Sequence, residues 1–331
     1  MTKRIAVVGA GSWGTALAVI AARAGHEVSL WSRDAEIVKS ITEQRINSRY
    51  LTAISIPDRV SATNDIEDAL DNAALVLLAA PSHAARQLLA EMSPELDDDA
   101  IIVSVSKGIE TETGKRISEI VREVAGSRAF VCLSGPSFAK EVVAGSPTAV
   151  VAASKDGAAA RTVQNDLSFE NLRIYTNTDV IGTELGGSVK NVMAIAAGMT
   201  TGLGLGANSV AALITRGLAE ITRLARREGA QVETLMGLAG LGDLVLTCTG
   251  HLSRNRFVGE QLGKGIALDE IVGGMNEVAE GIKTTRAVKQ LADRAGLEMP
   301  ITNEVNAVLY EGKSVRAAVA ELMSRPLREE A

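Results

Sequence analysis

A glycine-rich turn near the N-terminus is the first group of residues whose spacing suggests chemistry. Gly9, Gly11 and Gly14 follow the apolar run Ile5–Val8 and overlap the start of a helical pattern at Trp13–Ala24. In a strand–turn–helix unit, such glycines permit a tight turn, a close approach to a pyrophosphate and packing of the helix on the sheet. The N–H groups at the helix start would hold the anion. The pattern predicts a dinucleotide site, and a glycine turn without a ligand is the alternative.

The residues after the next apolar run bear on the choice of cofactor. Glu27–Trp31 predicts a second strand, and NAD sites usually place an acidic residue near its end to bind the ribose 2′-hydroxyl. Here Ser32 and Arg33 occupy that place, and an arginine can pair with a 2′-phosphate and stack on adenine. Asp34 is expected to cap a helix. We therefore predict NADP(H), with NAD(H) as the alternative cofactor. A solvated surface role is the alternative for Arg33.

Three further polar groups follow predicted strands, which is where open α/β sheets bind ligands. They are Pro81-Ser82, Ser106-Lys107-Gly108 and the run Ser-Gly-Pro-Ser-Phe-Ala at 134–139. Because Lys107 directly follows a buried strand, it could meet a phosphate or a carbonyl oxygen. An ordinary exposed lysine at a strand end is the alternative.

A lysine and an aspartate in the second half are candidates for proton transfer. Lys190 is predicted to open a helix and is followed closely by the apolar run Met193–Ala197, so we expect it to be partly desolvated. Burial lowers the pKa of a lysine and makes it a usable acid or base near neutrality. The glycines at 240 and 242 predict a tight loop for Asp243, which could orient a lysine or a substrate hydroxyl. The alternatives are a snorkelling lysine at a helix start and a turn carboxylate.

The run Ser253-Arg254-Asn255 combines a hydroxyl, a guanidinium and an amide. These groups, with nearby backbone N–H donors, could grip a phosphate. Arg256 is interpreted as surface charge.

Short apolar runs and helical patterns must position these groups. Over residues 4–152 the runs are continuous, as expected for strands covered on both faces, and their alternation with helices predicts a parallel sheet. The predicted strands are Arg4–Val8, Glu27–Trp31, Leu75–Ala79, Ile101–Ser104, Ala129–Leu133 and Thr148–Ala152. The predicted helices between them include Trp13–Ala24, His83–Met92 and Thr113–Val124.

The pattern changes near residue 185, beyond which only helices are predicted, over 188–199, 208–228, 277–295 and 301–310. A chain of 331 residues is also too long for one ordinary core. We therefore predict a Rossmann-type doubly wound α/β domain over 1–184, followed by an all-α substrate and catalytic domain over 185–331.

Composition excludes several classes of function. A net charge of −6 with well-mixed charges argues against a nucleic acid partner. Cys132 and Cys248 match no metal spacing and predict free thiols in a reducing compartment. The uncharged stretch 191–215 is long enough to cross a bilayer, but its glycines and polar residues favour two helices joined by a turn. We therefore expect a cytoplasmic protein with no membrane span and no metal.

Taken in order, the motifs of this chain resemble those of the NAD(P)-dependent glycerol-3-phosphate dehydrogenases of the soluble bacterial type, and the resemblance covers nearly the whole chain. The matching segments are Gly9–Gly14, Lys107-Gly108, Gly135–Ala139, Lys190-Asn191, Asn208–Glu220, Gly240–Leu244, Leu252–Arg256 and Val278–Thr284. The resemblance implies reversible reduction of dihydroxyacetone phosphate by NAD(P)H to sn-glycerol 3-phosphate, which feeds glycerophospholipid synthesis. It also implies a homodimer.

The resemblance further implies a role for each matching residue. Lys190 would be the acid/base at the C2 oxygen, with Lys107 and Asp243 beside it as catalytic residues. The implied substrate-binding residues are Lys107, Gly135, Ser137, Lys190, Asp243, Ser253, Arg254 and Asn255. The implied cofactor-binding residues are Gly9, Gly11, Ser12, Trp13, Gly14, Arg33, Tyr50, Lys107, Ala139, Arg254, Val278 and Glu280.

The sequence departs from the family pattern at one position, and it leaves two alternative functions open. Ser32 stands where relatives often carry a bulkier group, which leaves the strength of 2′-phosphate selection undetermined. A related two-domain reductase of another small 2-keto or 2-hydroxy acid, such as ketopantoate, is the second enzyme hypothesis, and the Ser-Arg-Asn run argues against it. A non-enzymatic NADP-sensing module is the third, and it would need neither a buried Lys190 nor a phosphate site.

Overall fold

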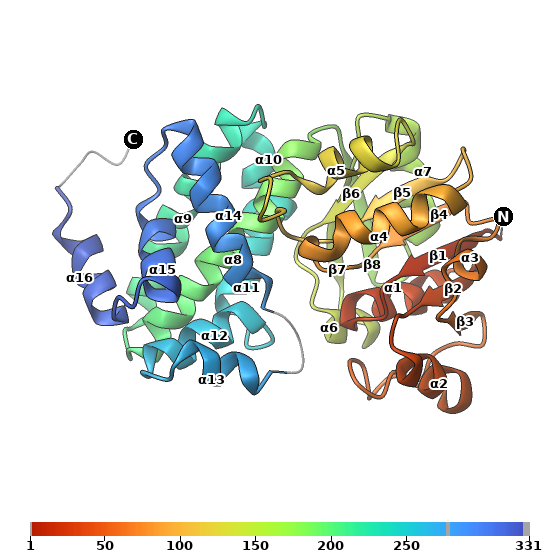
Figure 1. The fold of residues 1–331 in the computed structure, drawn as a ribbon, viewed down its shortest axis with the longest axis horizontal. Helices are drawn as coiled ribbons and strands as arrows, with labels where there is room; N and C mark the ends of the chain where they lie inside the picture. The colour runs from red at the N-terminus through yellow and green to blue at the C-terminus, as the bar shows by residue number, and fades with distance from the viewer. Residues whose placement is uncertain (1, 276–278, 327–331) are drawn as a thin grey trace. The chain divides into compact units, whose positions relative to one another are not determined.

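The computed structural model describes residues 2–275 and 279–326. The chain divides into two compact units (Figure 1). The first comprises residues up to 107 together with 115–184, and the second comprises 108–114 and 185 onward. The short segment 108–114 therefore packs with the helical unit, although strands of the first unit precede and follow it.

The first unit is built on one eight-stranded sheet. Its strands are β1 (Arg4–Val8), β2 (Glu27–Trp31), β3 (Val60–Thr63), β4 (Leu75–Leu78), β5 (Ile101–Ser104), β6 (Phe130–Ser134), β7 (Thr148–Ala153) and β8 (Leu172–Asn177). They lie in the order β3-β2-β1-β4-β5-β6-β7-β8. All neighbours are parallel except β6 and β7, which are antiparallel, so the predicted parallel sheet is corrected at that one pair. The order reverses between β1 and β4, and such a switch point is where these sheets bind ligands.

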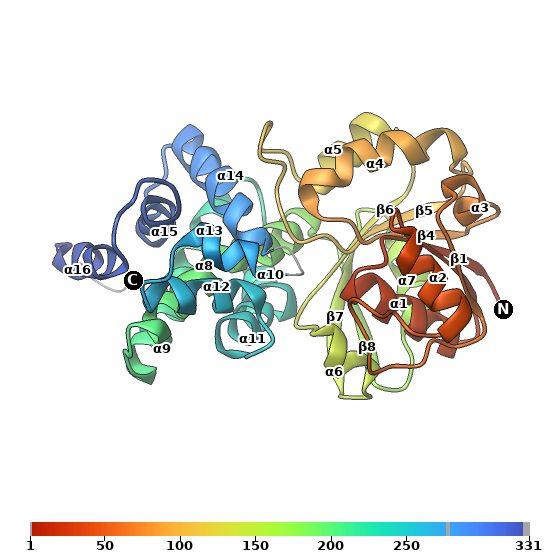
Figure 2. The same ribbon diagram turned by 60° about the horizontal axis from the view of Figure 1, so that its bottom comes forward.

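Helices cover both faces of the sheet, which explains why its central strands are apolar throughout. One face packs with α1 (Ser12–Arg23), α2 (Ala35–Gln44), α6 (Ala139–Val143) and α7 (Gly157–Leu167). The other packs with α3 (Ile66–Leu70), α4 (Ala85–Met92) and α5 (Ile117–Val124), and Figure 2 shows α4 and α5 on the side opposite α1. Along β1, Ile5 and Val7 face the first layer, whereas Ala6 and Val8 face the second. This doubly wound arrangement confirms the predicted fold class.

Two strands and two helix starts differ from the prediction. The helix predicted over 188–199 is α8 (Val180–Gly202), which begins eight residues earlier. β3 is short and half polar, and β8 alternates buried Leu172 and Ile174 with exposed Arg173 and Tyr175, so neither presents a continuous apolar run. The helix predicted from residue 113 begins only at Ile117 in α5, because the chain turns at Gly114 with a φ of +73°.

Helices are the only regular secondary structure among the described residues of the second unit, as predicted. They are α8 (Val180–Gly202), α9 (Ala207–Arg227), α10 (Val232–Met236), α11 (Asp243–Thr249), α12 (Arg254–Gly263), α13 (Leu268–Gly273), α14 (Glu280–Ala295), α15 (Pro300–Tyr310) and α16 (Val315–Ser324). The uncharged stretch 191–215 is the end of α8, a turn and the start of α9. None of the helices that the structure describes is long and apolar enough to cross a membrane.

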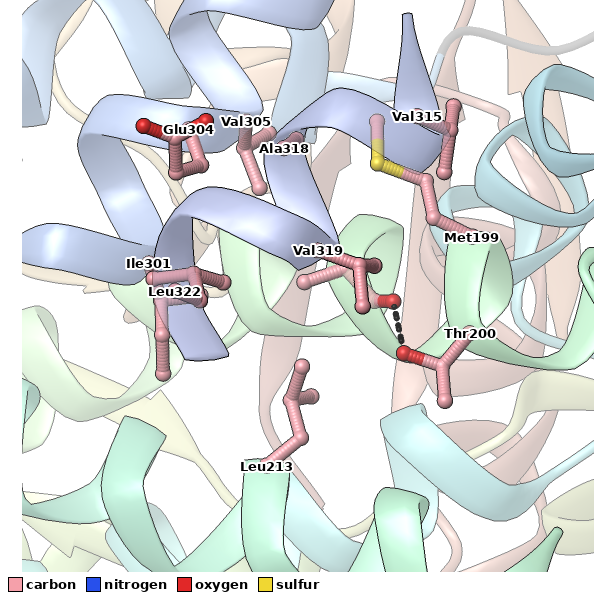
Figure 3. Close-up of a pocket in the computed structure, with 11 residues that line it drawn as sticks. Met199, Thr200, Leu213, Ile301, Glu304, Val305, Val315, Ala318, Val319 and Leu322 are labelled. Atoms are coloured by element: carbon pink, nitrogen blue, oxygen red, sulfur yellow. Dashed lines mark hydrogen bonds between the residues drawn. The ribbon is translucent and has the colours of Figure 1, made fainter. Parts of the chain in front are cut away.

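α8 is the buried centre of this unit and packs tightly against α12 at one glycine from each helix. A Cβ on Gly198 would lie 2.0 Å from the carbonyl oxygen of Arg256, and one on Gly259 would lie 1.9 Å from that of Ile195. The backbones of α8 and α12 are therefore in direct contact. A small apolar cavity of about 30 Å³ lies between α8, α9, α15 and α16 (Figure 3). It has room for about one or two water molecules and is too small for an organic ligand.

Candidate functional site

The three glycines of the turn after β1 differ in the space around them. Gly9 has a φ of +120°, and a Cβ there would lie 2.7 Å from the carbonyl oxygen of Ala79. A Cβ on Gly14 would lie 1.9 Å from the carbonyl oxygen of Gly9, so α1 packs directly on the turn. At Gly11, by contrast, a Cβ would meet no atom within 4 Å. The turn is thus closed at its first and third glycines and open at its second, where a pyrophosphate would approach.

The N-terminus of α1 offers donors to an anion. Gly11 is the N-cap residue, and no side chain caps the helix. The indole Nε1 of Trp13 is buried and has no hydrogen-bond partner within the described part of the chain. Buried donors normally have partners, so this unpaired N–H fits a site completed by a bound polar group. The turn and these donors fit the pyrophosphate of a dinucleotide.

A second segment, residues 47–51, is fastened to the glycine turn. Asn47 is fully buried, and its Nδ2 donates to the carbonyl oxygen of Ala10 at 2.8 Å and to Oγ1 of Thr15 at 2.9 Å. Its Oδ1 accepts from the backbone N–H of Tyr50 at 3.1 Å. Ser12 Oγ in turn donates to the carbonyl oxygen of Tyr50 at 3.1 Å. Tyr50 is therefore held beside the turn, although it is distant in sequence.

The end of β2 carries several charged groups. Asp34 caps α2 by accepting from the backbone N–H of Glu36 at 3.0 Å, as predicted. The guanidinium of Arg33 is 3.4 Å from a carboxylate oxygen of Glu91 and 6.0 Å from the ring centre of Trp31. The Arg33 side chain is 64% exposed, so a ligand can reach it.

Three predicted residues of the first unit meet at the carboxyl ends of β5 and β6. Lys107 Nζ donates to the carbonyl oxygen of Gly135 at 2.8 Å, and Ser137 Oγ donates to the same oxygen at 3.0 Å. Gly135 has a φ of +138°, and a Cβ there would lie 3.0 Å from the Cα of Val150. Only glycine fits this position without strain, and Ala139 then opens α6.

In the second unit, Lys190 is the centre of a buried polar cluster. It lies in the middle of α8, rather than at a helix start as predicted, and is 5% exposed. Its Nζ is 2.5 Å from Oδ1 of Asp243 and 2.8 Å from Oγ1 of Thr247. The Thr247 hydroxyl donates to the carbonyl oxygen of Asp243 at 2.6 Å. A lysine paired and buried in this way is not a snorkelling side chain.

Asp243 is the first residue of α11 and follows a π-helical turn at Leu238–Gly242. The tight loop predicted there is therefore helical. A Cβ on Gly186 would lie 2.5 Å from the carbonyl oxygen of Ala239, so α8 contacts the backbone of this turn. The close contact brings the start of α11 to Lys190.

The neighbouring thiol takes no part in this chemistry as a nucleophile. Burial raises the pKa of Cys248 to about 12, although the positive charge of Lys190 opposes the rise. The thiol is therefore protonated at neutral pH, and only a thiolate is a good nucleophile.

The predicted phosphate-binding residues lie at the start of α12. Ser253 caps the helix by accepting from the backbone N–H of Arg256, and Arg254 is exposed in the first turn. Asn255 is buried; its Nδ2 donates to Oδ1 of Asn191 at 3.0 Å, and its Oδ1 accepts from the backbone N–H of Gly281 at 2.9 Å. Asn255 therefore joins α8, α12 and α14, and its amide is largely engaged within the protein.

Comparison with known proteins agrees with this geometry. The family model described as NAD-dependent glycerol-3-phosphate dehydrogenase N-terminus matches residues 4–160, and the model for the C-terminus of the same enzyme matches 179–320. The chain belongs to this dehydrogenase family. A glycerol-3-phosphate dehydrogenase [NAD(P)+] of Koribacter versatilis is 55% identical over 98% of this chain and 97% of its own length. The glycerol-3-phosphate dehydrogenase [NAD(P)+] of Geobacter sulfurreducens is 51% identical over 100% of this chain and 99% of its own length.

Solved structures place this dehydrogenase among its relatives. The glycerol-3-phosphate dehydrogenase of Coxiella burnetii is 41% identical, with a TM-score of 0.95 over 98% of this chain and 99% of that one. A ketopantoate reductase of Ralstonia eutropha is 16% identical with a TM-score of 0.60 over 98% of this chain and 100% of that one, and shares the fold alone. The predicted family is confirmed, and NAD(P) is its cofactor.

The predicted residues of the dehydrogenase fall into two groups that different units carry. Gly9–Gly14, Arg33, Tyr50, Lys107, Gly135, Ser137 and Ala139 belong to the first unit, and Lys190, Asp243, Ser253–Asn255 and Glu280 to the second. Glu280 opens α14, and Val278 lies outside the described residues. The sequence reasoning missed Thr247 and Asn47. Thr247 stands four residues after Asp243, a helical spacing that could have revealed it; Asn47 gives no local signal.

Proposed function

We propose that this dehydrogenase uses NADPH to reduce dihydroxyacetone phosphate reversibly to sn-glycerol 3-phosphate, which would feed glycerophospholipid synthesis. The buried Lys190–Asp243–Thr247 cluster is the observation that carries the proposal, because it supplies an acid in a water-poor environment. The names of the relatives support the substrate. We also propose that the protein acts in the cytoplasm and forms a homodimer. Light scattering of the purified protein would test the dimer.

In this proposal the cofactor, when bound, supplies a hydride to C2 of the substrate. Gly11 and the N-terminus of α1 would hold its pyrophosphate, with Trp13 and Tyr50 beside it, and Arg33 would hold its 2′-phosphate. Lys190 donates a proton from Nζ to the C2 oxygen as the carbonyl becomes an alcohol, and then regains a proton from water. In the reverse direction the neutral amine accepts the hydroxyl proton.

Two neighbours of Lys190 make this proton transfer effective. The carboxylate of Asp243 stabilises the ammonium form and fixes the position of Nζ, so the acid is formed and aimed before the substrate binds. The Thr247 hydroxyl accepts a second hydrogen bond from Nζ and limits its rotation. Lys107 would also contact the substrate.

The phosphate would bind at the start of α12, where helix N–H groups and the Arg254 guanidinium offer donors. Arg254→Ala should raise the KM for dihydroxyacetone phosphate by about tenfold to a hundredfold. Turnover should fall as well, because remote binding energy positions the reacting carbon. Activity with unphosphorylated dihydroxyacetone should be poor and change little.

The test is a comparison of both substrates, with NADPH affinity measured in parallel. Arg227→Ala is the matched control, because Arg227 is an exposed arginine of the same unit at the end of α9. Asn255→Ala is less suitable, since it would also break the contacts with Asn191 and Gly281. If Arg254→Ala kept the wild-type preference for the phosphorylated substrate, the phosphate site would lie elsewhere.

A further inference from the structure

An acidic residue stands where the proposed 2′-phosphate site needs positive charge. Asp34 follows Arg33 directly, at the carboxyl end of β2 and before α2. In dinucleotide folds an acidic residue near the end of this strand binds the ribose 2′-hydroxyl of NAD. The same charge repels a 2′-phosphate, which carries up to about two negative charges near neutral pH. Taken alone, Asp34 would favour NADH.

A second arginine, Arg49, forms an ion pair with the Asp34 carboxylate. Arg49 Nη1 donates to Oδ2 of Asp34 at 3.1 Å, while Oδ1 of the same carboxylate caps α2. Both oxygens of Asp34 are therefore engaged, one by a backbone N–H and one by a guanidinium. The side chains of Arg49 and Asp34 are 51% and 37% exposed, so the pair lies at the surface, where a bound cofactor can sense its charge.

The position of Arg49 is fixed by the segment that borders the glycine turn. The backbone N–H of Arg49 donates to Oδ1 of Asn47 at 3.3 Å, and Asn47 is itself fully buried against the turn. The Arg49 guanidinium lies 5.4 Å from the ring centre of Tyr50, and the carbonyl oxygen of Tyr50 accepts from Ser12 in the turn. The same segment thus contacts the expected pyrophosphate site and places the Arg49 guanidinium near the end of β2.

We propose that the Arg49–Asp34 ion pair determines cofactor specificity, with Arg49 neutralising Asp34 so that the site accepts a 2′-phosphate. Arg33 is itself paired with Glu91. The four side chains of Arg33, Glu91, Asp34 and Arg49 therefore sum to zero charge, and loss of Arg49 leaves them at −1. The proposal rests on the proposed preference for NADPH, and it assigns that preference to the Arg49–Asp34 pair together with Arg33 rather than to Arg33 alone.

Three variants test the proposal: Arg49→Gln, Asp34→Asn and the two combined. Asparagine caps helices about as well as aspartate, so α2 keeps its N-cap in each. Arg49→Gln should weaken NADPH binding by about fivefold to tenfold, more than a surface pair alone would give, because the exposed carboxylate meets a phosphate with up to two charges. NADH binding should change by less than about twofold. In the combined variant, NADPH affinity should return to within about twofold of the wild type.

Affinities are measured for the full-length protein by quenching of Trp fluorescence or by calorimetry, without the second substrate. This choice separates the proposal from the proposed reaction, since a protein inactive toward dihydroxyacetone phosphate still yields both affinities. Arg59→Gln is the matched control: Arg59 pairs with Glu27 at the opposite, amino ends of β2 and β3, and should leave both affinities unchanged. The loss caused by Arg49→Gln should shrink as salt rises, because exposed charges are screened.

Two results would overturn the proposal. If the combined variant bound NADPH as weakly as Arg49→Gln, Arg49 would not act through Asp34. If Arg49→Gln weakened NADPH and NADH equally, the residue would support the fold of the segment and not the choice of cofactor.

Discussion

Replacing Lys190 by methionine tests the central acid of the proposed mechanism. Methionine has a similar length and suits a buried position on α8, but it carries no proton to donate. General acids typically contribute about 10²–10⁴-fold in rate, and we expect kcat to fall within this range. The change also removes the ion pair between Lys190 and Asp243, whose side chain is buried at 1% exposure. Breaking a buried ion pair in this way usually costs about 3–5 kcal/mol of stability, so a loss of activity alone would be ambiguous.

A combined variant, Lys190→Met with Asp243→Asn, separates the two effects. It removes the buried negative charge that Lys190 balances in the wild type, so the free energy of unfolding from urea titration should recover most of the loss, whereas kcat should not recover. Thr247→Val is a milder control that removes the hydroxyl contact with Nζ at 2.8 Å and keeps the ion pair. We expect it to lower kcat by about tenfold, in line with the loss of one hydrogen bond to a charged group.

The assay is the disappearance of NADPH absorbance with dihydroxyacetone phosphate, together with NADPH affinity measured by fluorescence. NADPH affinity should stay near the wild-type value in all three variants, because the residues at the glycine turn are untouched. The result that refutes the reasoning is a folded Lys190→Met protein that turns over at nearly the wild-type rate. The proton would then come from another group, and the buried cluster would be structural.

Three further changes have distinct expected outcomes. Arg33→Ala should weaken NADPH by about tenfold and NADH far less, because only NADPH carries the 2′-phosphate; equal losses would exclude Arg33 from reading that position. Gly14→Ala places a methyl group against the carbonyl oxygen of Gly9, so urea unfolding should show a loss of about 1–3 kcal/mol, with weaker NADPH binding. Burial raises the pKa of Glu220 above its usual 4.5, which disfavours its ionised form in the folded state. The free energy of unfolding of the wild type should therefore fall relative to that of Glu220→Gln as pH rises from about 4.5 through the raised pKa. The same pH dependence of the free energy of unfolding in both proteins would contradict this.

The fold was predictable from sequence where burial of an element produces a continuous apolar run. β1, β2 and β5 lie where continuous apolar runs predicted them, because strands covered on both faces have no polar side. β8 escaped prediction because it is an edge strand with exposed alternate residues, and β3 because it is short and half polar. The antiparallel step between β6 and β7 was not predictable, since strand direction depends on how a connection folds back rather than on the strand's own residues.

The candidate site was predictable in part for a related reason. Residue type and local apolar context identified Lys190, but its partners come from α11, more than fifty positions later, and such distances leave no periodic signal. Asn47 illustrates the same limit, because its buried amide acts on Ala10 and Thr15 across more than thirty residues. Asn255 is a third case: its amide suggested a ligand, and in the fold that amide also joins neighbouring helices, a role that no local pattern indicated.

The glycines of α8 explain how the second unit keeps a charged cluster in place within an apolar core. Gly186 contacts the turn before α11, and Gly198 and Gly202 contact the backbone of α12, where a Cβ would lie 2.0–2.5 Å from carbonyl oxygens. These contacts are rigid because no side chain stands between the helices. A buried lysine needs its carboxylate within hydrogen-bond distance, since a small displacement would leave both charges uncompensated. Direct backbone contact on both sides of Lys190 supplies that precision, and the same contacts fix the start of α12, where the substrate phosphate is proposed to bind.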